Sequence, residues 1–531
     1  MTEEPQISQS QGFGIPRAML LMGVAALGSV FLLLVVTRAE ALMGQIADLP
    51  AMCLLVVALL IGIPIGKADA SRRLVDFAVK PRSLVLVSLG VFVVLAVGTV
   101  LVFGTTPLSS DEHVHLFQAR LFAQFQIVGS YPPALIDQII PPGYLHSTIL
   151  VAPDGRAMAS TWPGWALLMT PFVWLGAPWL LGPAMASLGI YLMGRLASLL
   201  SGTRAAAIAI LLTVTSGAFI VTGMSLYPNG GHLTLSLLYA WLLLRGGRRD
   251  TVLAGLVGGL ALNLNNPLPH AAFALPWVIW LVADRTRRGR LVWLAAGYIP
   301  WLVVLCGWFL ETSSIQTFQQ SSVSAMVNVP NIDVISWRFW ELLRGWAWAA
   351  PGLFVLAVIG LRRESRNSAA WILGITFWLV IAVYAFAPVG QGLGWGARYY
   401  QTAWGALPIL AGLLLVRPGQ EVLTRIVVVA ALAGLVLVVP LQIGYAHGLA
   451  QQGQSSSAYI QSLEAPGVNL YFVKFDALHD ASITLLDDPS LSGTAILASQ
   501  GPDADRQVVE RWFPGARLIT SNSHGSGYAR P

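Results

Sequence analysis

The fold of this chain is decided by stretches such as residues 84–115, which read LVLVSLGVFVVLAVGTVLVFGTTPLSSDEHVH. Residues 84–104 form an apolar run of about 20 residues, the length of a helix that spans a bilayer. Two serines, two carboxylates and two histidines follow within a few positions. This order predicts a membrane span that ends directly at a cluster of reactive side chains.

The composition of the whole chain agrees with a membrane protein. Its 531 residues are 56% hydrophobic and only 11% charged, with a mean hydropathy of +0.68, whereas soluble domains carry about 25% charged residues. So few charges cannot cover a water-soluble protein of this size. The net charge is +6, but no basic stretch is interleaved with aromatic residues, which argues against nucleic-acid binding. Cys53 and Cys306 lie in apolar runs, which excludes a disulfide framework.

Similar apolar runs recur along the chain and predict thirteen membrane spans. The candidate spans are residues 18–37, 49–66, 84–104, 182–201, 205–222, 229–244, 251–267, 268–283, 291–311, 346–361, 369–388, 401–416 and 426–445. If the N terminus is cytoplasmic, the cytoplasmic loops hold 19 of the 31 basic residues, and the outer loops before residue 446 hold six. This asymmetry follows the positive-inside rule. We therefore predict an α-helical polytopic protein of the bacterial inner membrane, with an outer C-terminal region.

The predicted loops divide the chain into four regions. They are a disordered cytoplasmic arm (1–16), two additional N-terminal spans with a basic loop (17–83), a transmembrane core (84–445) and a small outer α/β unit (446–531). The outer loops of the core are 105–181, 312–345 and 389–400. In the C-terminal unit, residues 469–475, 494–499 and 517–520 predict strands, and residues 503–512 predict a helix. All eight histidines fall on the outer side, so we expect the chemistry of the protein there.

Asp111 and Glu112 are the strongest candidates for catalytic residues. Ser109 and Glu112 have the spacing of a capping box. An apolar residue then recurs at every fourth position, at Phe117, Leu121 and Phe125. The pattern predicts a short amphipathic helix on the outer membrane surface, with both carboxylates kept ionised by the helix dipole. Two interpretations remain open, namely a catalytic pair and a pair of helix caps.

A metal site is the third interpretation of the same segment. It would use Asp111, Glu112, His113 and His115. Histidines two positions apart do not share a helix face, so we predict neither a metal nor another cofactor.

Further blocks of sequence, in the same order and on the same side, resemble the GT-C glycosyltransferases. The blocks are Tyr131-Pro132-Pro133, Asp154-Gly155-Arg156, Trp162-Pro163-Gly164-Trp165 and Gly394-Trp395-Gly396-Ala397-Arg398-Tyr399. This superfamily of multispanning enzymes includes the protein O-mannosyltransferases and the aminoarabinose transferases that act on lipid A. The resemblance covers roughly residues 84–520, and the spans within 18–66 look like additions. The chain departs from bacterial relatives at Thr161-Trp162-Pro163-Gly164, where they usually have Tyr-Pro-Pro-Gly.

The resemblance implies a reaction and two roles. An acceptor hydroxyl would attack the anomeric carbon of a polyprenyl-phosphate sugar at the outer face, while the lipid phosphate leaves. Asp111 matches the position of the catalytic base, and Glu112 matches the neighbour that orients the base or the acceptor. The implied partners are the lipid-linked sugar, a lipid, glycan or protein acceptor, and the membrane, without nucleic acid.

Arg398 is the candidate for binding the lipid phosphate. An arginine between glycines and Tyr399-Tyr400 suits bidentate contact with a phosphate, and the alternative is an interfacial anchor. The other candidate substrate contacts are Tyr399, His115, Arg120, Asp154 and His232. For Asp154 the alternative is a turn residue, and for His232 it is a hydrogen-bonded interfacial histidine. We interpret Arg344, which precedes two tryptophans, as an anchor in an aromatic belt.

Two other classes of function remain open. A transporter or flippase of lipid-linked sugars typically has internal repeats and ionisable residues deep in its spans. The predicted spans here are almost free of charge, Arg195 being the clearest exception, and no duplicated half is found. A surface polysaccharide ligase or polymerase would also use outer loops, and only the order of the motifs argues against it.

Overall fold

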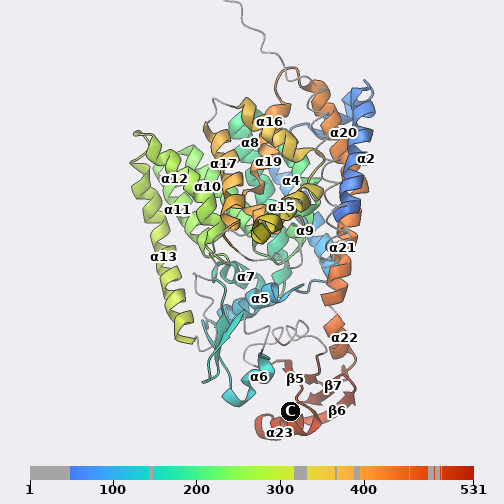
Figure 1. Ribbon diagram of the computed structural model, residues 1–531. Coiled ribbons are helices and arrows are strands. Elements are labelled where there is room, and N and C mark those ends of the chain that lie inside the picture. The colour runs from blue at the N-terminus through green and yellow to red at the C-terminus, as the bar shows by residue number, and fades with distance from the viewer. Residues whose placement is uncertain are drawn as a thin grey trace, which may run out of the picture.

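The structure is a computed structural model that describes residues 48–142, 148–315, 332–364, 368–387, 395–453, 455–475, 484, 491 and 493–531. The predicted arm (1–16) and the first predicted span (18–37) lie outside these residues. Helices dominate the described part of the chain. Their bounds are given below in chain order, with the labels of Figure 1.

The N-terminal helices are α2 (Asp48–Lys67), α3 (Ser71–Ala78), α4 (Leu84–Gly98) with the π-helical turn η1 (Thr99–Phe103), and α5 (Ser110–Ala123). The next region has the 3-10 turn η2 (Pro133–Leu135), α6 (Ile136–Ile139), α7 (Gly164–Trp174) and the turn η4 (Pro178–Leu180). The central helices are α8 (Leu181–Val214), α9 (Gly217–Met224), α10 (Asn229–Arg245), α11 (Arg248–Leu262), α12 (Leu268–Ala283) and α13 (Arg290–Ile315). The remaining helices are α15 (Ile332–Ala347), α16 (Leu353–Arg363), α17 (Ser368–Tyr384), η5 (Arg398–Tyr400), α18 (Gln401–Trp404), α19 (Ala406–Leu415), α20 (Glu421–Leu437), α21 (Val439–Gly453), α22 (Ser455–Gln461) and α23 (Pro502–Trp512).

Five helical segments of the described chain are long and apolar enough to cross a membrane. They are Asp48–Lys67, Leu84–Phe103, Pro178–Val214, Arg290–Ile315 and Glu421–Gln451. Three more predicted spans coincide with the shorter apolar helices α12, α17 and α19. The chain therefore has several membrane-spanning helices, while the count of thirteen stays a prediction.

Helix α8 contains the predicted span 182–201 and the first part of the predicted span 205–222. The backbone is not helical at Ser201 and Gly202, where the chain changes direction. Gly202 has a φ of 84°, in the left-handed region that suits glycine because it has no Cβ atom. The interruption falls where the sequence predicts a loop between two spans.

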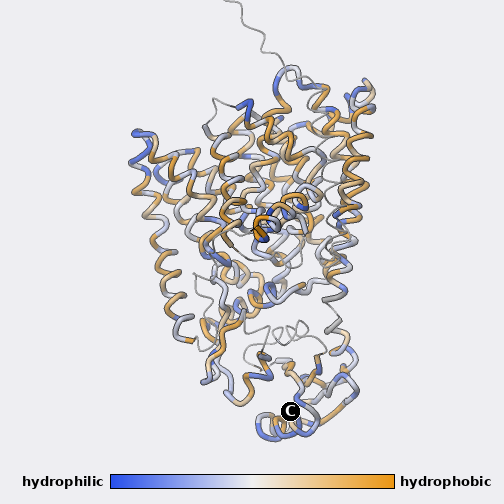
Figure 2. Tube along the Cα trace, viewed as in Figure 1, coloured by the Kyte–Doolittle hydropathy of each residue, from blue (hydrophilic) through white to orange (hydrophobic). Residues whose placement is uncertain are grey.

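The long helices stand side by side as an upright bundle, with α13 at one edge and α2 and α20 at the other (Figure 1). Hydrophobic residues cover this bundle, whereas hydrophilic residues gather at its ends and in the C-terminal unit (Figure 2). Helix α13 is the most exposed of the long helices, with Val303 66% and Leu310 69% exposed. In a bilayer these apolar faces would contact lipid. A helix is stable there because it satisfies its own backbone polar groups.

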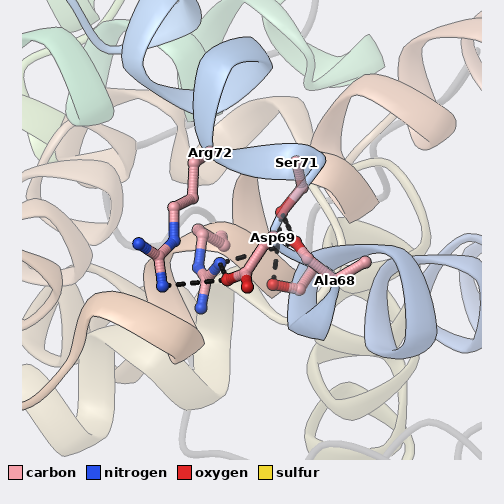
Figure 3. A network of polar contacts seen from close by, with 6 residues as sticks. Ala68, Asp69, Ser71 and Arg72 are labelled. Atoms are coloured by element: carbon pink, nitrogen blue, oxygen red, sulfur yellow. Dashed lines mark hydrogen bonds and ion pairs between the residues drawn. The ribbon is translucent and has the colours of Figure 1, made fainter.

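Helix α2 packs closely along α20. A Cβ atom on Gly66 would lie 2.6 Å from the backbone of Ile426, so only glycine permits this approach. The turn that follows α2 is tied to α20 as well. There Asp69 pairs with Arg72 at 2.8 Å and with Arg425 at 3.8 Å (Figure 3). Because Asp69 is 82% exposed, these pairs contribute little, typically below about 1 kcal/mol each, and the close packing of α2 on α20 is the main contact.

The opposite end of α2 makes a buried ion pair. Asp48 accepts hydrogen bonds from Nε of Arg344 at 2.8 Å and from Nε1 of Trp348 at 2.7 Å. The interpretation of Arg344 as an interfacial anchor is therefore wrong, since its side chain is only 15% exposed and paired within the protein. Asp48 of α2 thus pairs with the positive charge of Arg344 on α15.

Helix α5 does not lie on the membrane surface with its apolar stripe in lipid. Phe117 and Leu121 are buried, and they share a core with Ile139 of α6 and Leu470 of the C-terminal sheet. Phe125 follows the end of the helix and is 89% exposed. The predicted helix is confirmed, but Phe117 and Leu121 pack against protein, and on another face of the helix Leu116 and Ala119 pack against α7.

Two small sheets accompany the helices. The first is antiparallel with the order β1-β3-β2, formed by β1 (Gly129–Ser130), β2 (Ile149–Val151) and β3 (Arg156–Ala159). The second has the order β5-β4-β7-β6, formed by β4 (Leu470–Val473), β5 (Ala495–Ala498), β6 (Arg517–Asn522) and β7 (Gly525–Ala529). In it, β4 and β5 are parallel with Leu470 opposite Ala495, and the other pairs are antiparallel. Three strands and α23 stand where the C-terminal sequence predicts them, and β7 was missed.

Candidate functional site

Asp111 and Glu112 lie in the first turn of α5, just beyond the span formed by α4 and η1. Ser109 is the N-cap residue, as predicted, but its side chain makes no capping hydrogen bond. Its hydroxyl instead accepts a hydrogen bond from the hydroxyl of Tyr227 at 2.7 Å. The predicted capping box is therefore wrong, and both carboxylates are available for other contacts.

The two carboxylates have opposite environments, because successive side chains of a helix point in different directions. The side chain of Asp111 is 48% exposed, whereas Glu112 is fully buried. The carboxylate of Asp111 is therefore accessible from outside, whereas that of Glu112 is enclosed by protein.

Glu112 joins three separate segments of backbone. Its Oε1 accepts the N–H of Leu226 at 2.8 Å, and its Oε2 accepts the N–H of Leu108. Burial raises the pKa of Glu112 to about 7, although these hydrogen bonds and the charge of Arg398 act in the opposite direction. With this pKa, the charge of Glu112 changes near neutral pH. Its hydrogen bonds connect the start of α5 to the segment between α9 and α10.

The structure brings Arg398 to the same place. Its Nη2 lies 3.7 Å from Oδ2 of Asp111, and its side chain is only 4% exposed. Gly396 and Ala397, which precede it, both have positive φ values, of 64° and 53°. A Cβ atom on Gly396 would lie 2.5 Å from that of Ala218, so this turn fits tightly and directs the arginine inward.

Tyr227 and Asn229 complete the surroundings of Arg398, and sequence reasoning missed both. The guanidinium lies 4.0 Å from the ring centroid of Tyr227, a favourable cation–π distance. Asn229 donates a hydrogen bond to the carbonyl of Arg398 at 3.0 Å. The only signal in the sequence is the polar Tyr-Pro-Asn-Gly-Gly segment before His232.

Tyr399 contacts both Arg398, whose guanidinium lies 5.5 Å from the centroid of its ring, and a second tyrosine. Its ring stacks on that of Tyr384 at 5.2 Å, with an interplanar angle of 5°. Burial raises the pKa of Tyr399, the charge of Arg398 opposes this shift, and the charge of Asp111 adds to it. Four of the predicted site residues, Asp111, Glu112, Arg398 and Tyr399, therefore form one group.

The interpretation of this segment as a metal site depends on His113 and His115 of α5. Burial lowers the pKa of His113 to about 4 and that of His115 to about 3, so both are neutral at physiological pH. His113 contacts the carbonyl of Ser109 through Nδ1 at 2.9 Å. Among the described residues, no three His, Cys, Asp or Glu side chains are placed to hold a metal ion. His115 is buried in the helix rather than exposed beside Asp111.

The remaining candidates lie in other surroundings. Asp154 stands in the turn between β2 and β3 and binds Nε of Arg156 at 2.9 Å, which is the geometry of a turn residue. His232 is buried in α10 with Nε2 3.0 Å from the amide oxygen of Asn265. Arg120 lies in the last turn of α5. In the described part of the chain, neither Asp154 nor His232 forms a hydrogen bond or ion pair with the group around Asp111.

A small hollow with room for about one water molecule borders Glu112. It is lined by residues from η1, η4 and the α9–α10 connection, including Phe103, Thr106, Trp179 and Leu226. Asp111 and Arg398 are not among its lining residues, and its size leaves no room for a sugar. Of the predicted site residues, only Glu112 lines this hollow.

Comparison with known proteins gives a fold. No family model matches this chain, and no curated protein matches its sequence. Among solved structures, ArnT from Cupriavidus metallidurans in the apo state aligns with a TM-score of 0.53 and 15% identity, over 83% of this chain and 99% of its own. The same ArnT bound to undecaprenyl phosphate aligns with a TM-score of 0.55 and 15% identity, over 84% and 99%.

This chain has the fold of ArnT. ArnT is a GT-C aminoarabinose transferase, so the resemblance that the motifs predicted is confirmed at the level of the fold. A third structure, the arabinosyltransferase EmbB from Mycobacterium smegmatis, aligns with a TM-score of only 0.37 and 17% identity over 62% of this chain and 30% of its own. That similarity is too low to carry an argument.

Proposed function

We propose that this chain is a membrane glycosyltransferase that moves a sugar from a polyprenyl-phosphate donor to an acceptor hydroxyl. The observation that carries the proposal is the contact between Asp111 and Arg398 at 3.7 Å within an ArnT-like fold. An exposed carboxylate suits the acceptor hydroxyl, and a guanidinium suits the phosphate. One of the similar ArnT structures has undecaprenyl phosphate bound, which supports a polyprenyl-phosphate partner here.

In the proposed reaction, the acceptor oxygen attacks the anomeric carbon while its proton moves to the carboxylate of Asp111. The bond between the anomeric carbon and the phosphate oxygen breaks, and its electrons stay on the departing polyprenyl phosphate. The negative charge on the phosphate increases in this step. A cation held nearby therefore stabilises the transition state more than the ground state. Arg398 is that cation.

Glu112 has an indirect role in this proposal. Its two backbone hydrogen bonds hold the start of α5 against the residues before α10, which keeps Asp111 opposite Arg398. Tyr399 is a candidate contact for the donor, whereas His115, Arg120, Asp154 and His232 are weaker candidates because of their surroundings. We propose no metal or other cofactor, because Arg398 meets the charge of the leaving group.

We place the reaction at the outer face of the bacterial inner membrane, with a cytoplasmic N terminus. The distribution of basic residues between predicted loops supports this orientation. The acceptor is a lipid, glycan or protein hydroxyl.

The test is a transfer assay with membranes that contain the protein. The membranes are incubated with a panel of labelled polyprenyl-phosphate sugars, and label in acceptor molecules is measured against membranes that lack the protein. Transfer from one donor supports the proposal. If the protein moves labelled lipid-linked sugar between leaflets without forming a new glycosidic bond, it is a flippase instead.

A further inference from the structure

Helix α15 has a stripe of charged side chains on its protein-facing side. Arg338, Glu341 and Arg344 recur at every third position and are 4%, 6% and 15% exposed. The opposite side is apolar and open, with Ile332 73% and Ile335 47% exposed. In water such a helix would turn its charges outward, so the reversed arrangement requires a partner for each charge inside the protein.

Glu341 finds its partners on two different elements. It forms an ion pair with Arg338, one turn earlier on α15. It also accepts a hydrogen bond from the hydroxyl of Tyr400 at 3.0 Å. Arg338 in turn donates to the carbonyl of Ala387 at 2.9 Å. Displacing this buried carboxylate would cost free energy, because it would leave the charge of Arg338 unpaired.

Tyr400 belongs to the same short helical turn, η5, as Arg398. This turn follows the left-handed residues Gly396 and Ala397, and two tyrosines fix it on one side. Tyr400 is anchored by Glu341, and Tyr399 is stacked on Tyr384. The orientation of the turn, and with it the direction of the Arg398 side chain, is therefore held from α15 through Tyr400 and from α17 through Tyr384.

We propose that Glu341 is a positioning residue for Arg398 and acts through the hydroxyl of Tyr400. The inference rests on the proposed function, in which Arg398 meets the phosphate of the donor. Glu341 does not touch the substrate. It holds η5 so that the guanidinium already points to the phosphate position before the donor binds, and a rigid arrangement of this kind reduces the cost of binding.

The experiment uses the full chain in membranes and the labelled donor on which it is active. Tyr400→Phe removes one hydroxyl and leaves the ion pair of Glu341 with Arg338 intact. We expect the KM for the donor to rise roughly tenfold, and the KM for the acceptor to stay unchanged. Tyr471→Phe is the matched control, because it also removes one hydrogen bond from a buried tyrosine, in the C-terminal sheet. A merely structural defect would lower the active fraction, and so kcat, without moving either KM.

A double-mutant cycle tests whether Glu341 acts through Tyr400. Glu341→Gln alone should raise the donor KM at least as much as Tyr400→Phe, because it weakens the hydrogen bond of Tyr400 and also removes the charge that pairs with Arg338. The effect of the two changes together should be smaller than the sum of the single effects, because both act on the contact between Glu341 and Tyr400. Additive effects would contradict the inference. If Glu341→Gln fails to fold because Arg338 loses its partner, the donor KM of Tyr400→Phe decides by itself.

Arg398→Ala separates this inference from the proposed function. If Arg398→Ala raises the donor KM while Tyr400→Phe has the donor KM of the wild type, the positioning role is overturned and the proposed function stands. If Arg398→Ala transfers sugar normally, the proposed function fails first.

Discussion

Arg398 and Asp111 form an ion pair of unequal exposure, with Nη2 3.7 Å from Oδ2 and side chains that are 4% and 48% exposed. The guanidinium is held by protein on nearly every side, whereas half of the carboxylate is open. A molecule that enters this place meets a fixed cation and an accessible carboxylate at the same time.

Asp111→Asn should abolish sugar transfer while the protein still folds and inserts. The change keeps the size of the side chain and removes its ability to accept a proton, so the expected loss of rate is on the order of 10²–10⁴. The matched control is Asp503→Asn, which removes the same charge from the first turn of α23 and should transfer as the wild type does. Normal transfer by Asp111→Asn would show that this residue is not the base.

Arg398→Lys should weaken use of the donor although it keeps the positive charge. Lysine lacks the planar fork that binds two phosphate oxygens, and the loss of one charge-assisted hydrogen bond corresponds to roughly ten- to a hundredfold. The measurement is the inhibition of transfer by free undecaprenyl phosphate, which should become weaker by that factor. Arg511→Lys on α23 is the control. An unchanged inhibition constant would assign Arg398 to structure alone.

Asp48→Asn should destabilise the protein, because it leaves the buried charge of Arg344 without its carboxylate. Breaking a buried pair in this way typically costs about 3 kcal/mol, which thermal unfolding in detergent would detect. Asp69→Asn is the control, since its pairs at the end of α2 are exposed (Figure 3) and contribute below about 1 kcal/mol. Adding Arg344→Gln to Asp48→Asn should restore part of the loss, and a further loss would contradict the pairing.

The pH dependence of stability should change in Glu112→Gln. The folded protein raises the pKa of Glu112 from 4.5 to about 7, so the folded state binds this proton more tightly than the unfolded state. The contribution of Glu112 to the free energy of unfolding is therefore largest below pH 4.5 and falls by roughly 3 kcal/mol as the pH rises to 7.

The measurement is the unfolding midpoint of both proteins between pH 4.5 and 8. Wild type should lose stability relative to Glu112→Gln as the pH rises through this window. Glu510→Gln, an exposed change on α23, should leave the pH profile of the wild type unaltered. Parallel profiles for the wild type and Glu112→Gln would show that the proton of Glu112 does not distinguish the folded state.

The orientation in the membrane can be tested with fused reporters. A reporter that is active only after export should be active when fused after Gly467 and inactive when fused after Arg363. The reason is the concentration of basic residues in the loops that include Arg362 and Arg363. Activity at Arg363 would reverse the orientation and place Asp111 on the cytoplasmic side.

Local patterns in the sequence were enough to predict the long apolar helices, but not α15, most of which lies within the predicted outer loop 312–345. An apolar run of the length of α4 or α13 can satisfy its backbone in lipid only as a helix, so its identity does not depend on the rest of the chain. The same holds for the start of α5 at Ser109 and for the interruption of α8 near Gly202. Asp111 was also accessible to sequence reasoning, because its position directly after a span is a local feature.

What the side chains of these helices contact was decided only by the tertiary structure. The stripe of Phe117 and Leu121 predicts an apolar partner but does not distinguish lipid from the C-terminal sheet, whose residues stand more than 300 positions later. Helix α15 turns its apolar face outward and its charged face inward, which is the reverse of the pattern expected in water. The sequence alone therefore does not show that Glu341 and Arg344 are buried. Tyr227, Tyr400 and Asp48 reach their partners across more than 50 positions of chain, and no local signal specifies such contacts. They follow from the packing of the helices, which brings the starts of α5 and α10 and the turn η5 together around Arg398 and places the start of α2 against α15.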